Sequence, residues 1–523
     1  MVATLGVVYT PPEVARLMVA RALEPLLGTI EQVLALRICD PALGEGAFLL
    51  EVIELLADRL AALGLDRADA RRGVAEQCIF GADTDARAVA VARAATGAGE
   101  HLRVGDALTL PWDPFDAVVG NPPYIRQERI ADKLRLRSFE VFDGVADLYV
   151  YFVELAHRIL RPGGRYCLVL PNKWLTAAYG RPLRAFLAAR ASVEGLVDIG
   201  RGLPLFAEVD AFPCIVWGTL GAASPTIHCE RLARHAPLSL APAHAQPRAI
   251  WQAAPWHLDA PADRALIDRL ERTWPALGEL VGRPARGVVT GCNRVFVIDG
   301  ATRQRLIDRE PACSALIRPF VKGRDLRRWR VAPGDRWIVL IDRGTSLAAL
   351  PGLTAYLEEH RAALEPRPAD WTGAWPGRKP GAYRWLELQD PVGALAGSRE
   401  PRLFYQDIQT GPACCLDESG LVPDTTVWIL PSQDRFLLAV LNSPLYGWYA
   451  QRRFPPALNG SIRPKLEYIT ALPIATPTTG ARAAITALVE RCLAAPTPEL
   501  EAAIAAAVLE AYELSPSERR LLG

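Results

Sequence analysis

Residues 34–48 have the sequence LALRICDPALGEGAF, in which an apolar run is followed by an acidic turn that contains two glycines. The apolar run Leu34–Cys39 predicts a strand, and the spacing of apolar residues over Ala47–Leu60 predicts the helix after the turn. Glycine lets a backbone approach a ligand closely, and a helix N-terminus offers unpaired N–H groups. The stretch therefore predicts a strand–turn–helix unit whose turn can bind a ligand.

The alternation of strand and helix continues through the first half of the chain. Further strands are predicted at Cys78–Ala82, Phe115–Val119 and Tyr166–Leu170, and helices at Ala86–Ala95 and Leu148–Leu160. Such alternation builds a parallel sheet that binds ligands at the carboxyl ends of its strands. We therefore expect an α/β fold, with a Rossmann-like domain first.

The composition is that of a globular protein of more than one domain. The 523 residues exceed what one hydrophobic core usually supports, and 50% are hydrophobic and 22% charged. The 59 Lys and Arg against 58 Asp and Glu leave a net charge of +1, so a nucleic-acid partner would need a local basic patch. The ten cysteines form no C-x-x-C pair, so we expect free thiols, no disulfide framework and no metal site.

The second half has a different pattern. Pro, Ala and His interrupt any period over Leu220–Asp263, which indicates a connection between domains, and short alternating runs with Gly and Pro breaks follow from Gly287. Thr497 and Pro498 are placed as N-cap and first-turn residue of a last helix. We predict a catalytic domain (1–245), a connection (246–285), a mixed α+β domain (286–478) and a helical tail (479–523). The strands expected in the mixed domain include Val288-Val289, Val295–Ile298, Trp337–Ile341, Leu403–Tyr405 and Thr426–Leu430.

Three acidic residues follow three successive predicted strands. Asp40 opens the glycine turn, Asp83 ends the second strand, and Asp106 follows the next short apolar run. Each could be an ordinary strand-end or N-cap residue, but together they define one crevice at the edge of a parallel sheet. Their pattern fits a ligand that carries an amino-acid end, a ribose and an adenine.

The sequence Asn121-Pro122-Pro123-Tyr124 follows the predicted strand at 115–119. A proline-rich turn is one interpretation. Beside an adenosine-binding crevice, a second is catalysis on an exocyclic amine, whose lone pair is delocalised into its ring. The side-chain oxygen of Asn121 and the carbonyl of Pro122 can accept the amine hydrogens and favour its nucleophilic form. Prolines fix the loop, and Tyr124 offers a face on which a planar base can stack.

With these motifs, the chain resembles the gamma-class N6-adenine DNA methyltransferases, the TaqI-like group, over most of its length. Residues 10–13 (TPPE) are similar to the motif that closes over the methionine part of S-adenosylmethionine, and 40–48 to the cofactor loop. Asp83 stands where many relatives have Glu. The resemblance implies cofactor contacts from Thr10, Pro11, Asp40, Pro41, Ala42, Gly44, Asp83, Asp106, Asn121 and Phe152. It implies catalysis by Asn121, Pro122 and Tyr124, and stacking of a flipped adenine between Tyr124 and Phe206, which could otherwise be a core residue.

The second half resembles the DNA-recognition domain of the same group, in 286–299, 317–329, 401–408 and 437–453. Residues 283–330 hold twelve Arg and Lys against four Asp and Glu, an excess of eight positive charges, with tryptophans nearby. Such a run is often a solvated face, but beside a base-modifying site it indicates DNA contact. The predicted DNA-binding residues are Arg286, Arg294, Lys322, Arg324, Arg327 and Arg328.

The resemblance implies S-adenosylmethionine as cofactor and double-stranded DNA as partner. A separate cognate restriction endonuclease or defence-system subunits are further partners that it allows. N4-cytosine methylation, and NPPY-type methylation of rRNA or of a protein glutamine, stay open as alternatives. No P-D-x(n)-[D/E]-x-K pattern and no long segment before Thr10 are found, so a fused nuclease is not expected. Cys214 follows Pro213 as in C5-cytosine enzymes, but its place beyond the NPPY strand predicts a buried strand residue.

No stretch reaches the roughly 18 uninterrupted apolar residues of a membrane helix, and the N-terminus lacks a signal-peptide pattern. We therefore expect no membrane contact and a cytoplasmic, nucleoid-associated location.

Overall fold

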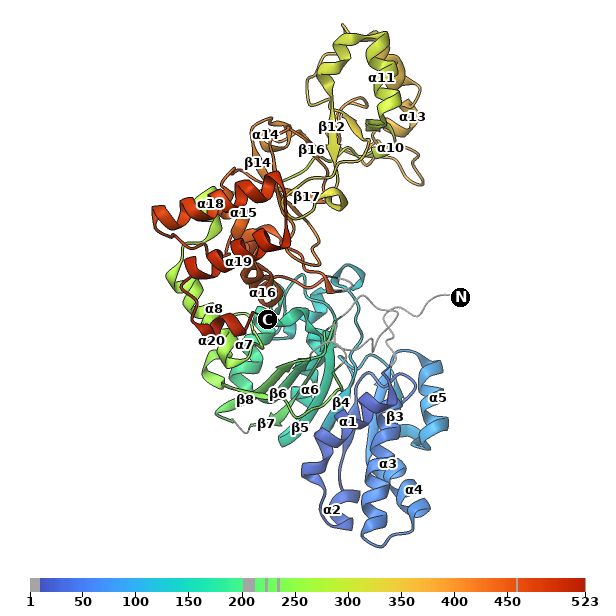
Figure 1. Cartoon of the computed structure of the whole chain (residues 1–523). Coiled ribbons are helices and arrows are strands. Elements are labelled where there is room, and N and C mark those ends of the chain that lie inside the picture. The colour runs from blue at the N-terminus through green and yellow to red at the C-terminus, as the bar shows by residue number, and fades with distance from the viewer. Residues whose placement is uncertain (1–9, 201–211, 222–223, 233–235, 458–459, 523) are drawn as a thin grey trace. The chain divides into compact units, whose positions relative to one another are not determined.

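The computed structural model describes residues 10–200, 212–221, 224–232, 236–457 and 460–522. The chain divides into two compact units, Met1–Pro261 and Ala262–Gly523 (Figure 1). The predicted connection 246–285 falls on both sides of this division.

The first unit is built on one sheet of nine strands. Its order is β3-β2-β1-β4-β5-β7-β6-β8-β9, with β1 to β5 parallel and β7 antiparallel to both β5 and β6. This is the doubly wound order 3-2-1-4-5-6 with one antiparallel strand inserted. The strands are β1 (Ile38–Asp40), β2 (Ile79–Asp83), β3 (Leu102–Val104), β4 (Phe115–Gly120), β5 (Leu160–Pro171), β6 (Ala191–Asp198), β7 (Pro213–Leu220), β8 (Thr226–Arg231) and β9 (His244–Pro247).

Helices cover both faces of this sheet (Figure 1). Successive strand residues point to opposite faces, so Ile38 joins the core with α1, α3, α4 and α5, and Cys39 joins the core with α6 and α7. The predicted Rossmann-like α/β fold is therefore confirmed. The helices are α1 (Pro12–Leu23), α2 (Ile30–Leu34), α3 (Ala47–Ala62), α4 (Arg67–Gln77), α5 (Ala86–Thr96), α6 (Tyr149–Ile159) and α7 (Arg181–Arg190).

Two predictions for the first unit were wrong in part. The strand expected from Leu34 begins at Ile38, because a capping box between Thr29 and Gln32 starts helix α2 and carries it to Leu34. The segment 220–263 is not a connection throughout, since β8 pairs with β6 and β9 with β8.

Trp251 and Trp256 belong to the first unit as well, because both are buried in the core that α6 and α7 share. They lie 4.8 Å apart between ring centroids. The irregular composition of this stretch gave no signal for the two short strands or for the aromatic core contact.

The second unit contains two four-stranded sheets, in the orders β10-β17-β14-β15 and β11-β13-β12-β16. Predicted strands at 337–341, 403–405 and 426–430 are confirmed in their main parts. Val295 and Phe296 instead end helix α10, and Val288 forms only an isolated bridge with Asp424. The strands are β10 (Ala285–Arg286), β11 (Val297–Ile298), β12 (Ile317–Val321), β13 (Trp337–Val339), β14 (Arg402–Gln406), β15 (Cys414–Asp417), β16 (Val422–Pro423) and β17 (Val427–Leu430).

Helices α15, α16, α18 and α19 pack on the β14–β15–β17 sheet around one apolar core. As predicted, Thr497 caps α19 by accepting a hydrogen bond from the N–H of Leu500, with Pro498 in the first turn. The helices are α8 (Pro261–Thr273), α9 (Leu277–Val281), α10 (Asn293–Phe296), α11 (Gly300–Arg309), α12 (Pro351–Glu358), α13 (Arg361–Leu364), α14 (Ala394–Gly397), α15 (Arg435–Leu441), α16 (Pro444–Arg453), α17 (Leu466–Ile469), α18 (Thr479–Ala494), α19 (Pro498–Ala511) and α20 (Pro516–Arg520).

Within the described part of the chain, none of the helices combines the length and apolar character that crossing a membrane requires. The described residues also hold no cluster of three or more His, Cys, Asp or Glu suited to a metal ion. All ten cysteines are free thiols.

Candidate active site

The glycine turn after β1 is fixed by its own backbone and by the neighbouring strand. The Oδ1 of Asp40 accepts the N–H of Ala42 at 3.0 Å, and the N–H of Leu43 donates to the carbonyl of Ala82 at 3.1 Å. Gly44 has a φ of +51°, a left-handed conformation that favours glycine, and a Cβ built on it would meet no atom within 4 Å. The turn therefore presents an open, backbone-lined surface at the carboxyl edge of the sheet.

Asp83, at the end of β2, is tied to this turn. Its Oδ2 accepts the N–H of Gly44 at 3.1 Å, and its Oδ1 accepts the N–H of Asp85 at 2.9 Å. The carboxylate thus links the cofactor turn predicted after β1 to the start of α5. Each oxygen keeps a further lone pair with which it can accept a hydroxyl hydrogen.

Burial changes the charge state of Asp40. The side chain is 1% exposed, and this desolvation raises its pKa from 3.8 to about 7, with a smaller contribution from the nearby Asp83 carboxylate. Gly120, at the end of β4, lies against it: a Cβ on Gly120 would come within 2.5 Å of Asp40 Oδ1. The absence of a side chain at Gly120 is therefore what lets β4 end beside the acid.

Asn121 follows Gly120 at the point where the strand order reverses between β1 and β4. Its Nδ2 donates to Thr10 Oγ1 at 3.1 Å, and Thr10 is buried. The bond joins two predicted site residues 111 positions apart and orients the amide. Pro11 is the N-cap residue of α1, and Pro122 is buried.

Tyr124 packs edge-on against Tyr149 of α6, with ring centroids 6.4 Å apart, and burial raises the pKa of its phenol. The hydroxyl of Tyr149 lies 2.9 Å from that of Tyr179. This tyrosine support behind the NPPY loop was not predicted, although Tyr149 lies in the helix predicted over Leu148–Leu160.

Asp106 follows β3, and Phe152 lies on α6. The Oδ1 of Asp106 accepts the N–H of Leu108 at 3.1 Å, and its Oδ2 pairs with Arg135, a contact that no sequence pattern signalled. Phe152 is buried in the same apolar cluster as Ala107. Phe206, the predicted second stacking residue, lies outside the described residues.

Cys214 is a buried residue of β7, as predicted, and burial raises the pKa of its thiol well above its usual value. A thiol in this state is a poor nucleophile.

The predicted DNA-binding residues of the second unit lie in different surroundings. Arg294, Arg324 and Arg327 are exposed, and Lys322 is half-buried at the end of β12. Arg286 contacts Asp407 at 3.7 Å and lies over the ring of Trp428.

Other cations of the 283–330 stretch are used inside the fold. Arg328 pairs with Glu501 of α19 at 2.8 Å and donates to the carbonyl of Asn442. Arg318 is buried and donates to the carbonyls of Gly397, Ser398 and Gly420. The excess of eight charges therefore overstates the basic surface available to a ligand.

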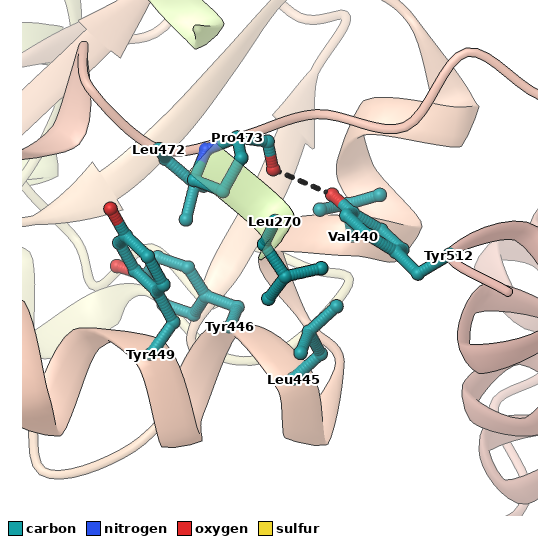
Figure 2. A pocket seen from close by; sticks show the side chains of 8 residues that line it. All are labelled: Leu270, Val440, Leu445, Tyr446, Tyr449, Leu472, Pro473 and Tyr512. Atoms are coloured by element: carbon teal, nitrogen blue, oxygen red, sulfur yellow. Dashed lines mark hydrogen bonds between the residues drawn. The ribbon is translucent and has the colours of Figure 1, made fainter. Parts of the chain in front are cut away.

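The second unit also has a small pocket, lined by Leu270, Val440, Leu445, Tyr446, Tyr449, Leu472, Pro473 and Tyr512 (Figure 2). The hydroxyl of Tyr512 donates to the carbonyl of Pro473 at 2.8 Å. Its lining is mostly apolar and belongs to the core around α15 and α16, so we assign it to packing.

Comparisons with known proteins agree with this geometry. A structure of the type IIL restriction-modification enzyme MmeI in complex with DNA superposes with a TM-score of 0.66 at 14% identity, covering 98% of this chain and 74% of that one. The chain thus shares with that structure an α/β fold with an additional domain.

Sequence comparison finds similarity to one type of enzyme. The chain is 29% identical over 489 residues to the type II methyltransferase M.PaeR7I of Pseudomonas aeruginosa, covering 84% of this chain and 80% of that protein. It is 28% identical to M.XhoI of Xanthomonas vasicola, with 83% and 84% covered. The family model for the Eco57I restriction-modification methylase matches residues 112–206, which include the NPPY loop. Over most of its length the chain is thus similar to type II methyltransferases of restriction–modification systems.

Proposed function

We propose that this protein transfers the methyl group of S-adenosylmethionine to N6 of an adenine flipped out of double-stranded DNA. The observation that carries the proposal is the place of Asn121. It directly follows Gly120, which ends β4 at the switch point of the sheet and lies against Asp40, and its amide is oriented by the 3.1 Å bond to Thr10. Ligands of doubly wound sheets bind at such a point.

The oriented amide explains how the loop acts on a weak nucleophile. Because Nδ2 donates to Thr10, Oδ1 is the amide atom that accepts a hydrogen of the target amine. The carbonyl of Pro122 accepts the second hydrogen, and together they favour the tetrahedral form of the nitrogen. Thr10 and the prolines hold these acceptors in place before the substrate enters, so little reorganisation accompanies the reaction.

The acidic edge fits the proposed cofactor. S-adenosylmethionine supplies an electrophilic methyl group on a positively charged sulfur, and it carries a ribose with two hydroxyls and an adenine. Asp83 would accept from the ribose hydroxyls, and Asp106 and Phe152 would contact the adenine. Thr10, Pro11, Asp40, Pro41, Ala42, Gly44 and Asn121 would hold the methionine part.

The target base would stack on Tyr124, with Phe206 proposed for its other face. A stacked adenine cannot present its amine to the methyl donor within a duplex, so it has to leave the helix. A duplex with 2-aminopurine at the target position tests this step. Its fluorescence should rise on binding, and less so in Tyr124→Ala, because a stacking face contributes about 1–3 kcal/mol.

The relatives are modification enzymes, so we propose that this protein is the modification component of a restriction–modification or phage-defence system. In that setting its partners are double-stranded DNA and a separate endonuclease or defence subunit. In the second unit, Arg286, Arg294, Lys322, Arg324 and Arg327 are proposed to contact the DNA, with Arg328 positioning the helical tail.

Sequencing of genomic DNA from a host that expresses the protein tests the proposal. We expect N6-methyladenine at one sequence motif and none in a host that expresses Asn121→Ala. If N4-methylcytosine were found at a motif instead, the target base would be cytosine and not adenine. Unmodified DNA, with label transferred to rRNA or to a protein glutamine instead, would overturn DNA as the substrate.

A further inference from the structure

The chain directly after the catalytic loop carries an unusual density of positive charge. Residues 126–137, here called the basic arm, contain five cations against two acids. The arm includes two short turns of 3₁₀ helix, Gln127–Arg129 and Leu134–Ser138, and begins two residues after Tyr124. Neither the family match nor the sequence analysis assigns it a role.

The cations of the arm fall into two groups. Arg135 pairs with Asp106, and Lys133 donates to Gln127 Oε1 and to the carbonyl of Gly144. Arg126, Arg129 and Arg137 are exposed and form no ion pair within the described part of the chain. Three guanidinium groups are therefore available to a ligand.

The acids that follow the arm do not neutralise these three groups by pairing with them. Glu140 pairs with Arg190 at 3.0 Å, Asp143 accepts the N–H of Val145, and Asp147 accepts the N–H of Gln127 at 2.9 Å. Their carboxylates are engaged within the segment or with α7, and among the residues that the structure describes none of them forms an ion pair with the three exposed arginines.

The arm is also held in place before any ligand binds. The N–H of Leu148 donates to the carbonyl of Ile125 at 3.0 Å, which closes the base of the segment. Leu136 and Phe139 are buried in the core around α6, and Arg158 of that helix donates to the carbonyl of Ser138 at 2.8 Å. Preorganised cations lose less conformational entropy on binding than cations on a free loop.

A cation from another element joins the arm. Burial raises the pKa of Asp147, and the positive charges of Arg126 and of Lys173, which is exposed just after β5, oppose this shift. Both cations therefore lie near this carboxylate. Basic groups from two strand ends therefore converge next to the NPPY loop. A base that enters this loop brings the phosphates of its own nucleotide and its neighbours to the same edge.

We propose that the basic arm binds the DNA phosphates that flank the flipped adenine, through Arg126, Arg129 and Arg137. The inference rests on the proposed function. It means that the first unit binds the DNA backbone through its own residues, in addition to any contacts of the second unit.

The test compares two full-length variants of equal charge change. Arg129→Ala with Arg137→Ala removes two cations of the arm. Arg71→Ala with Arg72→Ala removes two cations of α4, which pair with Glu54 and Asp69; this helix leads into the amino end of β2, away from the carboxyl edge of the sheet. The probe is a short duplex centred on an adenine that the parent enzyme methylates, titrated over a range of salt concentrations by fluorescence anisotropy.

The arm variant should lower the log–log salt slope of DNA affinity by about 2, because each neutralised phosphate contributes about 0.9. The α4 variant should keep the parent slope, and both should bind S-adenosylmethionine as the parent does. Methylphosphonates at the phosphates next to the target adenine should weaken the parent and the α4 variant but not the arm variant.

Equal slopes for the two variants, or equal sensitivity to the methylphosphonates, would overturn the inference while leaving the proposed function intact. A parent enzyme that methylates no DNA would instead defeat the proposed function, before the probe could be made.

Discussion

The carboxyl edge of the sheet in the first unit and the basic stretch 283–330 in the second hold their charges in different ways. At the edge, Asp40, Asp83 and Asp106 each accept a backbone N–H from the turn beside them. In the basic stretch, the buried Arg318 donates hydrogen bonds to three backbone carbonyls, whereas Arg324 is exposed to solvent. Charges fixed by backbone turns keep their positions relative to each other. Charges counted along a chain do not define a surface.

The largest effect is expected on the rate of methyl transfer, from a substitution of Asn121 at the carboxyl edge of the sheet. Asn121→Ala should reduce methyl transfer about 10²–10³-fold, because it removes an acceptor that acts mainly in the transition state. Thr10→Ala, which keeps the amide but removes its orienting partner, should lose less. Transfer from labelled S-adenosylmethionine measures both, with calorimetry to show that the cofactor still binds. Turnover of Asn121→Ala close to that of the parent enzyme would show that Asn121 does not act in catalysis.

The second prediction separates the two kinds of arginine in the basic stretch. Arg318→Ala should lower the free energy of unfolding by about 1–3 kcal/mol, because buried carbonyls lose their donor. Arg324→Ala should change stability by less than about 0.5 kcal/mol but flatten the salt dependence of DNA binding. Denaturant unfolding and anisotropy provide the two measurements. Equal stability of the two variants would contradict the distinction between a structural Arg318 and a solvent-exposed Arg324.

The third concerns the link that Asp83 makes between two turns. Asp83→Ala should weaken S-adenosylmethionine binding by about 1–3 kcal/mol, because ribose hydroxyls lose a charged acceptor and Gly44 loses its partner. Asp85→Ala is the matched control, since that neighbouring carboxylate only caps α5 through the N–H of Arg87. If calorimetry gave the two variants the same affinity, Asp83 would be an ordinary strand-end residue.

The smallest effect is a pH dependence. Asp40 is about half protonated near pH 7, and a cationic cofactor favours its ionised form, so affinity should rise between pH 6 and 8 and binding near pH 7 should release protons. Asp40→Asn should bind with little dependence on pH. Calorimetry in buffers of different ionisation enthalpy measures the proton release, and none at pH 7 would contradict the assignment.

The same pKa has a consequence for stability. The folded protein holds this proton more tightly than the unfolded chain, whose pKa is near 3.8. Asp40 therefore favours folding fully below about pH 4, and that contribution is lost as the pH rises through 7.

Much of the first unit could be predicted because its signals are local. The turn at 40–46 and the helix after it depend on residues adjacent in sequence, and the structure has both where they were expected. Strands β8 and β9 could not be predicted, since their short segments are strands only through pairing of β8 with β6 and of β9 with β8.

The candidate site divides in the same way. Asp40, Asp83 and Asn121 could be found because motifs place them at strand ends. The bond between Asn121 and Thr10, and the pairing of Asp106 with Arg135, join residues distant in sequence, which no local pattern encodes. Arg318 and Arg328 were counted as surface charge because their partners come from elements far along the chain.

We propose above all that the Asn121 amide, oriented at the edge of the sheet, activates the exocyclic amine of adenine for methylation by S-adenosylmethionine. The most direct measurement incubates the purified protein and Asn121→Ala with duplex DNA and labelled S-adenosylmethionine, then digests the DNA to nucleosides and separates them. The account predicts label in N6-methyl-2′-deoxyadenosine with the parent protein and a loss of at least about 10²-fold in the variant. Label in N4-methylcytosine, or equal labelling by the two proteins, would contradict it.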